Sequence, residues 1–196
     1  MSSGSDVPQN GVAALRALAH PTRLALLDLL RTHDTLTASA SAQLLGLSPK
    51  TCSYHLHVLA GHDLVVPATD AAPGQREHPW RRAYDELPVH LNDLSGKQDP
   101  QRQQAVDALL RTGLSHNYGT LLRAVEGRGS WDAGWLAAAT AHSRTVLMSA
   151  EQLQAWGEAV ERATREAVAA AVANRSPDQH PVRLALYGLP ERPGPT

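Results

Sequence analysis

A group of cationic, hydroxyl-bearing and aromatic side chains lies close together in the first half of the chain. The group follows the Ser48–Pro49 pair and consists of Lys50, Thr51, Ser53, Tyr54 and His57. A lysine can neutralise a phosphate, and hydroxyl, phenol and imidazole groups can hydrogen bond to phosphate oxygens or to the edges of bases. These residue types therefore indicate reversible binding to a nucleic acid.

The spacing of these residues predicts that they share one face of a helix. Cys52, Leu56 and Leu59 recur at i, i+4 and i+7 and would form an apolar stripe on the opposite face. Ser48 can cap this helix, and Pro49 fits its first position, where a backbone N–H has no helical partner. We therefore expect a helix that begins at Pro49 and has one buried and one polar face.

A short helix and a tight turn are needed to orient that polar face. The segment ASASAQLL, residues 38–45, predicts the helix, and Ala42 is small enough to let two helices cross closely. Gly46 suits a turn with positive φ, and Leu45 and Leu47 can fill the angle between the two helices. Together these features predict a helix-turn-helix.

Further elements before and after this pair predict a winged helix-turn-helix domain over residues 11–88. Helices are expected over 11–19 and from Pro21 onwards, each with leucines on one side. A short strand over 64–66, a turn-rich segment and a returning strand over 80–84 predict a hairpin wing.

The second half predicts another domain, over residues 99–190. Asp99–Pro100 has the chemistry of a helix start, and leucines and valines then fit one long amphipathic helix over 100–126, the expected dimerisation helix. The rest is expected to contain a strand over 144–148, a helix from a capping box at Ser149 to residue 173, and a strand over 182–190. Residues 131–142 fit a helix or a loop. The predicted fold class is mainly α with a small β-wing, followed by the long helix and a small α/β C-terminal segment.

The composition limits the classes of protein to which this chain can belong. The formal net charge is −1 over 196 residues, so no general basic field indicates a polyanionic partner. The single cysteine excludes an internal disulfide framework and suits a reducing, cytoplasmic setting. We expect no membrane partner, because no stretch reaches the ~20 apolar residues needed to cross a bilayer and the N-terminus has no signal-peptide core.

Two runs resemble a known family. AALRALAHPTRLALLDLL, followed by LLGLSPKTCSYHLHVLAGHDLV, resembles the ArsR-type winged-helix transcriptional regulators of bacteria over residues 11–86. The matching pattern is leu-ala-his-pro-x-arg before a leucine-rich helix, then leu-gly-leu-ser-x-x-thr and his-leu-x-x-leu. The second half more loosely resembles the longer members, which append a helix and a small α/β segment.

The resemblance implies a homodimeric regulator that binds an operator duplex and changes its affinity when a small-molecule effector binds. It places the helix after Ser48 in the major groove and the hairpin beside it. The implied DNA contacts are Ser48, Lys50, Thr51, Ser53, Tyr54, His57, Arg76, Arg81 and Arg82. Of the last two, adjacent on one strand, only one can face the duplex. Arg23 matches an arginine that braces the fold through an ion pair.

Metal sensing is a known function in this family, but the ligands are not in place here. The helix over 38–45 carries no cysteine, and Asp99 and His116 are the nearest candidates for a second type of site, with no other pair to complete four ligands. We therefore expect no metal and no cofactor. We also expect Cys52 to be a core residue, because reactive thiols need exposure, and His55 to be a half-buried packing residue.

The aromatic residues of the second half allow two interpretations. Tyr118, Trp131, Trp135 and Trp156 could line an effector pocket, or the tryptophans could form the core of a domain that has few other large side chains.

The function expected from the sequence is sequence-specific DNA binding by a transcriptional regulator, a homodimeric repressor with an unknown effector. One recognition helix makes too few contacts for useful specificity, whereas a two-fold dimer places two helices about 34–36 Å apart, one turn of the duplex. A winged helix used for protein contact is the alternative, favoured by the near-neutral charge. A small-molecule transferase fragment is a weaker one, because no glycine-rich loop or catalytic constellation follows the wing, so no catalytic residues are expected.

Overall fold

The computed structural model describes residues 11–68, 78–84 and 99–190. The contacts divide the chain into two compact units, Met1–Thr120 and Leu121–Thr196. This division falls inside a long helix, whereas the sequence suggested a second domain from residue 99. The domain limits 11–88 and 99–190 stay predictions.

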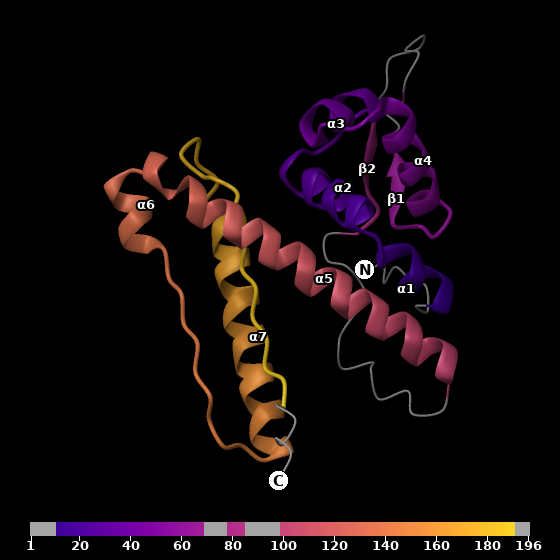
Figure 1. Cartoon of the computed structure of the whole chain (residues 1–196). Helices are drawn as coiled ribbons and strands as arrows, with labels where there is room; N and C mark the ends of the chain where they lie inside the picture. The colour runs from indigo at the N-terminus through magenta and orange to yellow at the C-terminus, as the bar shows by residue number, and fades with distance from the viewer. Residues whose placement is uncertain (1–10, 69–77, 85–98, 191–196) are drawn as a thin grey trace, which may run out of the picture. The chain divides into compact units, whose positions relative to one another are not determined.

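The first unit contains four short helices that agree with the predicted ones. They are α1 (Val12–Leu18), α2 (Pro21–Thr32), α3 (Ala38–Leu45) and α4 (Pro49–Ala60). Each of the last three begins at a side-chain cap, namely His20, Thr37 and Ser48, that accepts a hydrogen bond from a backbone N–H of the first turn. Local capping chemistry therefore fixes where these three helices, which are drawn in Figure 1, begin.

Two short strands follow the helices and form an antiparallel pair. They are β1 (Val65–Pro67) and β2 (Trp80–Arg82), with Val65 opposite Arg82 and Pro67 opposite Trp80. An isolated bridge joins Trp80 to Leu36, just before α3, through two backbone hydrogen bonds of 2.8 and 3.0 Å. The fold is therefore mainly helical with a two-stranded sheet after the helix-turn-helix, as a winged helix-turn-helix requires.

One apolar core holds the helices and the sheet of the first unit together. Its buried members include Leu26, Leu27, Leu30, Cys52, Leu56, Leu59, Leu64, Val65 and Trp80. The core consists of leucines of α2, the residues of the apolar stripe of α4, and the residues on the inner side of the wing. Any displacement of α4 therefore disturbs the packing of the whole unit.

The long helix α5 (Pro100–Glu126) has the predicted bounds. Asp99 Oδ1 accepts a hydrogen bond from the backbone N–H of Gln101 at 2.9 Å, which caps the first turn. A second small core joins Leu15 of α1 to Ala105 and Val106 of α5. Further along, His116 Nε2 lies 2.6 Å from Asp28 Oδ2 on α2. These contacts attach the first part of α5 to the winged helix-turn-helix.

The second unit is helical in its described part. After a single 3-10 turn it contains α6 (Ala133–Ala138) and α7 (Ala150–Ala173), so the open segment 131–142 is a helix only over residues 133–138. The predicted capping box is confirmed, because Ser149 and Gln152 exchange side-chain to backbone hydrogen bonds of 2.8 and 3.2 Å.

The two strands predicted for the second unit are wrong. Residues 144–148 and 182–190 belong to no β-ladder within the described part of the chain. Both segments carry strand-forming residues, but a strand needs a hydrogen-bonded neighbour, and none pairs with either of them. The second segment instead runs along α7 (Figure 1), where a Cβ on Gly188 would lie 2.9 Å from Leu153 Cδ1 and 2.5 Å from a ring atom of Trp156.

Gly46 has the one positive glycine φ in the described backbone, 65°, and ends α3 in the left-handed region. We expect Gly46→Ala to lower the free energy of unfolding by about 1 kcal/mol, because a Cβ disfavours this conformation. Gly46→Asn should cost less, since asparagine tolerates it. Urea unfolding measures both.

Gly113, inside α5, provides the matched control. It has negative φ and open space around it, so Gly113→Ala should raise the free energy of unfolding by up to about 1 kcal/mol. Equal effects of alanine at the two glycines would contradict the role assigned to the left-handed turn.

Candidate nucleic-acid interface

The turn between α3 and α4 sets the direction of α4. The backbone N–H of Leu47 donates to the carbonyl of Ala42 at 3.0 Å, which closes α3 after Gly46. Ser48 Oγ then accepts a hydrogen bond from the N–H of Thr51 at 3.0 Å and lies 2.8 Å from the Thr51 hydroxyl. The hydroxyl of Ser48, one of the expected DNA contacts, is therefore engaged in starting the helix.

The inner face of α4 is fully buried. Cys52, Leu56 and Leu59 have no exposed surface, which confirms the predicted apolar stripe and the core position of the cysteine. Burial raises the pKa of the Cys52 thiol, so the thiolate is disfavoured. His55 is 7% exposed and is thus more buried than the half-buried residue that we expected.

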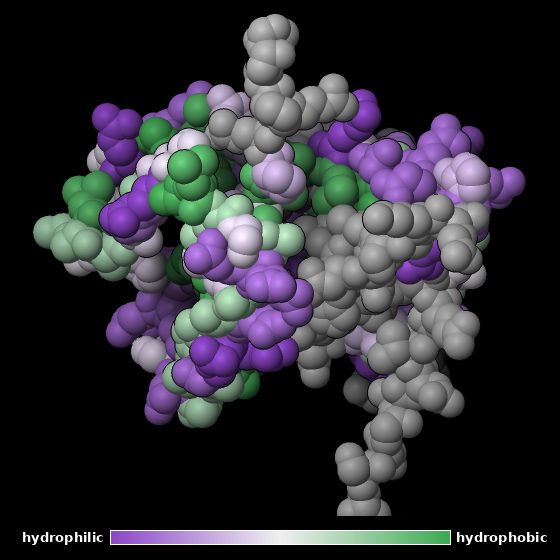
Figure 2. All heavy atoms as spheres, turned by 90° about the horizontal axis from the view of Figure 1, so that it is seen from below, coloured by the Kyte–Doolittle hydropathy of each residue, from purple (hydrophilic) through white to green (hydrophobic). Residues whose placement is uncertain are grey.

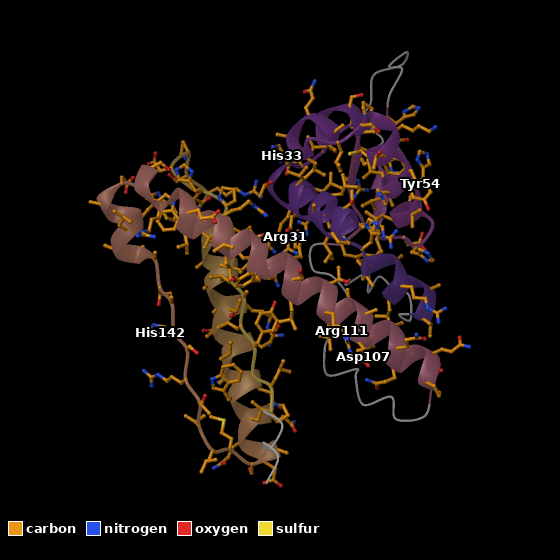
Figure 3. The ribbon with its side chains drawn as sticks, viewed as in Figure 1. Arg31, His33, Tyr54, Asp107, Arg111 and His142 are labelled. Atoms are coloured by element: carbon orange, nitrogen blue, oxygen red, sulfur yellow. The ribbon has the colours of Figure 1, made fainter. Side chains whose placement is uncertain are left out.

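The outer face of α4 is polar and open. Lys50, Tyr54 and His57 are exposed, with 63% of Tyr54 accessible, while Thr51 and Ser53 are half-buried. Tyr54 lies on α4 at the edge of the winged-helix fold (Figure 3). This face offers one cation, one phenol and one imidazole to a partner, and all three are exposed among the described residues.

The side chain of His57 lies between the backbone of α4 and Trp80 of the wing. Its Nδ1 is 2.7 Å from the carbonyl oxygen of Ser53, and its ring meets the Trp80 ring edge-on with centroids 5.2 Å apart. The Nδ1 atom bonds the helix backbone, so the ring is held in one orientation with Nε2 as its remaining polar atom. His57 therefore joins the two elements that a winged helix presents to DNA.

The two arginines of β2 have different surroundings, as the alternation of a strand requires. Arg81 is exposed, and its guanidinium donates to the neighbouring carbonyl of Arg82 at 3.4 Å. Arg82 is half-buried, and its Nε donates to the carbonyl of Leu30 at 3.2 Å, at the end of α2. Arg81 is thus the better placed of the pair for a phosphate. Arg76 lies outside the described residues.

Arg23 braces the fold, but through backbone carbonyls. Its Nε donates to the carbonyl of Ala17, and its NH2 donates to that of Arg16 at 3.1 Å. The expectation of an ion pair is corrected on this point, since no acidic partner of Arg23 is found among residues whose positions are given. The last carbonyls of α1 lack helical partners, and the guanidinium satisfies two of them.

A pair of histidines is the feature that the sequence analysis missed. The rings of His20 and His55 are in contact in a tilted arrangement, with centroids 4.5 Å apart. His20 enters the sequence analysis only as the histidine of the leu-ala-his-pro-x-arg pattern, and His55 only as a packing residue. The signal was present, because histidine is the residue before a proline at a helix start and can cap that helix.

The candidate metal ligands have other partners. His116 pairs with Asp28, and Asp99 caps α5. Across the described parts of the chain, no three His, Cys, Asp or Glu side chains gather as metal ligands would.

The candidate effector residues are distributed over both units. Tyr118 is exposed and belongs to the first unit, whereas Trp131 and Trp135 are half-buried in the second. The Trp135 ring lies edge-on to His180 at 5.3 Å, and Trp156 lies beside Gly188. An effector pocket formed by these residues stays a prediction.

The comparison with protein families agrees with this geometry. Residues 18–67 match the family described as a helix-turn-helix domain, from the last residue of α1 to the last residue of β1. No curated protein matches the chain. None of the helices described is both long and apolar enough to span a bilayer. The helix-turn-helix domain points to regulation through DNA binding rather than to an enzyme.

Proposed function

We propose that the chain is an ArsR-type winged-helix repressor that binds an operator duplex as a homodimer and responds to a small-molecule effector. One observation carries the proposal of DNA binding. The helix that follows the turn buries one complete face and exposes Lys50, Tyr54 and His57 on the other. A helix of this kind fits the major groove, where side chains at its exposed face reach base edges and phosphates.

The proposed contacts divide into positioning and reading groups. Lys50, at the start of α4, and Arg81, on the wing, suit phosphates, because a cation there neutralises backbone charge without reading sequence. Tyr54 suits a base edge, and His57, held by Ser53 and Trp80, suits either. The less exposed or already bonded candidates Ser48, Thr51, Ser53 and Arg82, together with Arg76, are proposed as weaker or backbone contacts.

The proposed dimer would form along α5. Its exposed residues Leu114, Tyr118, Leu121 and Val125 recur at i, i+4, i+7 and i+11, so that they form one apolar stripe on the helix. Hydrophobic and hydrophilic side chains are interspersed over the face of the molecule drawn in Figure 2. A stripe of this length is a suitable seam for a second copy, with α7 as a further candidate.

The test of DNA binding uses operator fragments selected from a random duplex library and full-length protein. Lys50→Ala is expected to weaken binding to all duplexes by a similar factor and to reduce the salt slope by about 1, because one phosphate contact is lost. Tyr54→Ala is expected to lose about 1–3 kcal/mol of discrimination at one base position. Fluorescence anisotropy over a salt series measures both, and the titration endpoint should give two chains per operator.

Arg111→Ala is the matched control, since Arg111 is an exposed cation on α5 (Figure 3). If Arg111→Ala weakens binding as much as Lys50→Ala does, the cationic contact is not specific to α4. The formal net charge of −1 favours protein contact as the second candidate function. Absence of duplex binding even at low salt would support that candidate instead.

A further inference from the structure

We propose that the His20–His55 pair is a proton-sensitive contact that holds α4 against the junction of α1 and α2, so that acid loosens α4 and weakens DNA binding. The part of this inference that concerns DNA rests on the proposed function; the part that concerns the contact does not.

The pair joins two elements that are distant in sequence. His20 precedes α2, and His55 lies in the middle of α4, yet their rings are in contact, with centroids 4.5 Å apart and planes tilted by 37°. His55 is 7% exposed, and its Nδ1 is the one buried side-chain polar atom in the described residues that has no hydrogen-bond partner. An imidazole in this position is tolerated as a neutral ring, whereas a charged one would lack both water and a partner.

His20 also performs a task that requires a free lone pair. Its Nδ1 accepts a hydrogen bond from the backbone N–H of Thr22 at 3.2 Å and so caps α2. A proton on Nδ1 would turn this acceptor into a donor that faces another donor, and the cap would be lost. The same proton would place a charge against the neighbouring ring of His55.

The groups around the pair oppose a second positive charge. Tyr54 meets the His55 ring edge-on from α4 with centroids 5.1 Å apart, and Arg23 on α2 is the nearby cation whose charge acts on both rings. Burial and then the nearby charge of Arg23 lower the pKa of His20. Burial, His20 and Arg23, in that order, lower the pKa of His55.

The direction of the pH effect follows from these lowered pKa values. Both rings have a pKa below the ordinary histidine value of 6.5 in the folded chain, so the unfolded chain binds more protons as the pH falls below 6.5. The stabilising neutral contact is therefore complete above this value and is lost as the pH falls through it towards the folded pKa. Protons on exposed histidines would instead strengthen attraction to phosphates, so a loss of DNA affinity in acid runs against the general electrostatic trend.

The contact also involves a residue that is proposed to read DNA. Tyr54 precedes His55 and packs against its ring, so a displacement of the ring moves the phenol on the outer face of α4. Loosening of the inner contact is thus expected to change DNA recognition before the whole unit unfolds.

The experiment compares full-length wild type, His20→Asn and the control His142→Asn at about pH 7.5 and about pH 5.5, either side of the ordinary histidine range. Asparagine can cap α2 without taking up a proton. His142 is exposed on the segment between α6 and α7 (Figure 3), so its replacement removes an imidazole that does not belong to the pair. The measurements are the thermal unfolding midpoint, the operator Kd, and histidine-ring NMR titration.

We expect the rings of His20 and His55 to titrate below 6.5, and the wild type and His142→Asn to lose more Tm and more affinity in acid than His20→Asn does. Titration of both rings at the ordinary value, or an equal acid loss in His20→Asn and wild type, would overturn the inference. If no protein binds a duplex at either pH, the proposed function fails, while the NMR and Tm results still decide whether the contact is proton-sensitive.

Discussion

Leu56→Ala is expected to lower the free energy of unfolding by about 2–5 kcal/mol, because it removes buried apolar atoms and leaves a cavity in the core. Leu56 has no exposed surface and lies in the core that joins α2, α4 and the wing. Its truncation therefore weakens the core shared by these elements. The unfolding midpoint in urea, followed by circular dichroism on the full chain, measures the change.

Leu44→Ala is the matched control, since Leu44 on α3 is 53% exposed. Its replacement should change the stability by less than about 0.5 kcal/mol, as surface substitutions usually do. If both substitutions had the same small effect, the inner face of α4 would not be packed as described. Operator binding by Leu56→Ala should also fall, because α4 is positioned by this face.

The first unit could be predicted well because its signals are local. Caps at Thr37 and Ser48, the proline that opens α4 and the glycine that ends α3 act within a few residues of the points they fix. The buried face of α4 followed from the spacing of Cys52, Leu56 and Leu59, since helical periodicity depends on no other part of the chain.

The second unit shows what local signals miss. Residues 144–148 and 182–190 have the composition of strands, but whether a strand forms depends on a partner elsewhere in the chain, which the segment itself does not encode. Gly188 is a local signal that does not favour a strand. A residue without a Cβ is needed there, because the chain passes over Trp156 at this point.

The side-chain interaction partners of the site residues were harder to predict than the positions of these residues in the fold. Arg23 was identified as a brace, but its acceptors are carbonyls of α1 that become available only because that helix ends there. The ring contact between His20 and His55 joins residues 35 positions apart, and no periodic pattern links them. The exposure of Lys50, Tyr54 and His57 could be predicted from the periodicity of the helix alone, and the structure exposes all three.

Trp80 is expected to be as important to stability as Leu56, with an added effect on the wing. Trp80→Ala should lower the free energy of unfolding by about 3–5 kcal/mol, because a large buried ring is removed. The ring is 8% exposed, belongs to the main core and meets His57 edge-on. The same substitution should lower operator affinity, because the contact between β2 and α4 is lost.

Trp80→Phe separates the two effects. Phenylalanine keeps an aromatic ring in the core, so the loss of stability should be smaller than that of Trp80→Ala, and the edge-on contact with His57 can be retained. Unfolding in urea and operator anisotropy on both variants measure stability and binding independently. Full operator affinity in a folded Trp80→Ala protein would show that DNA binding does not depend on the packing of the wing against His57. The contact between β2 and α4 would then serve stability alone.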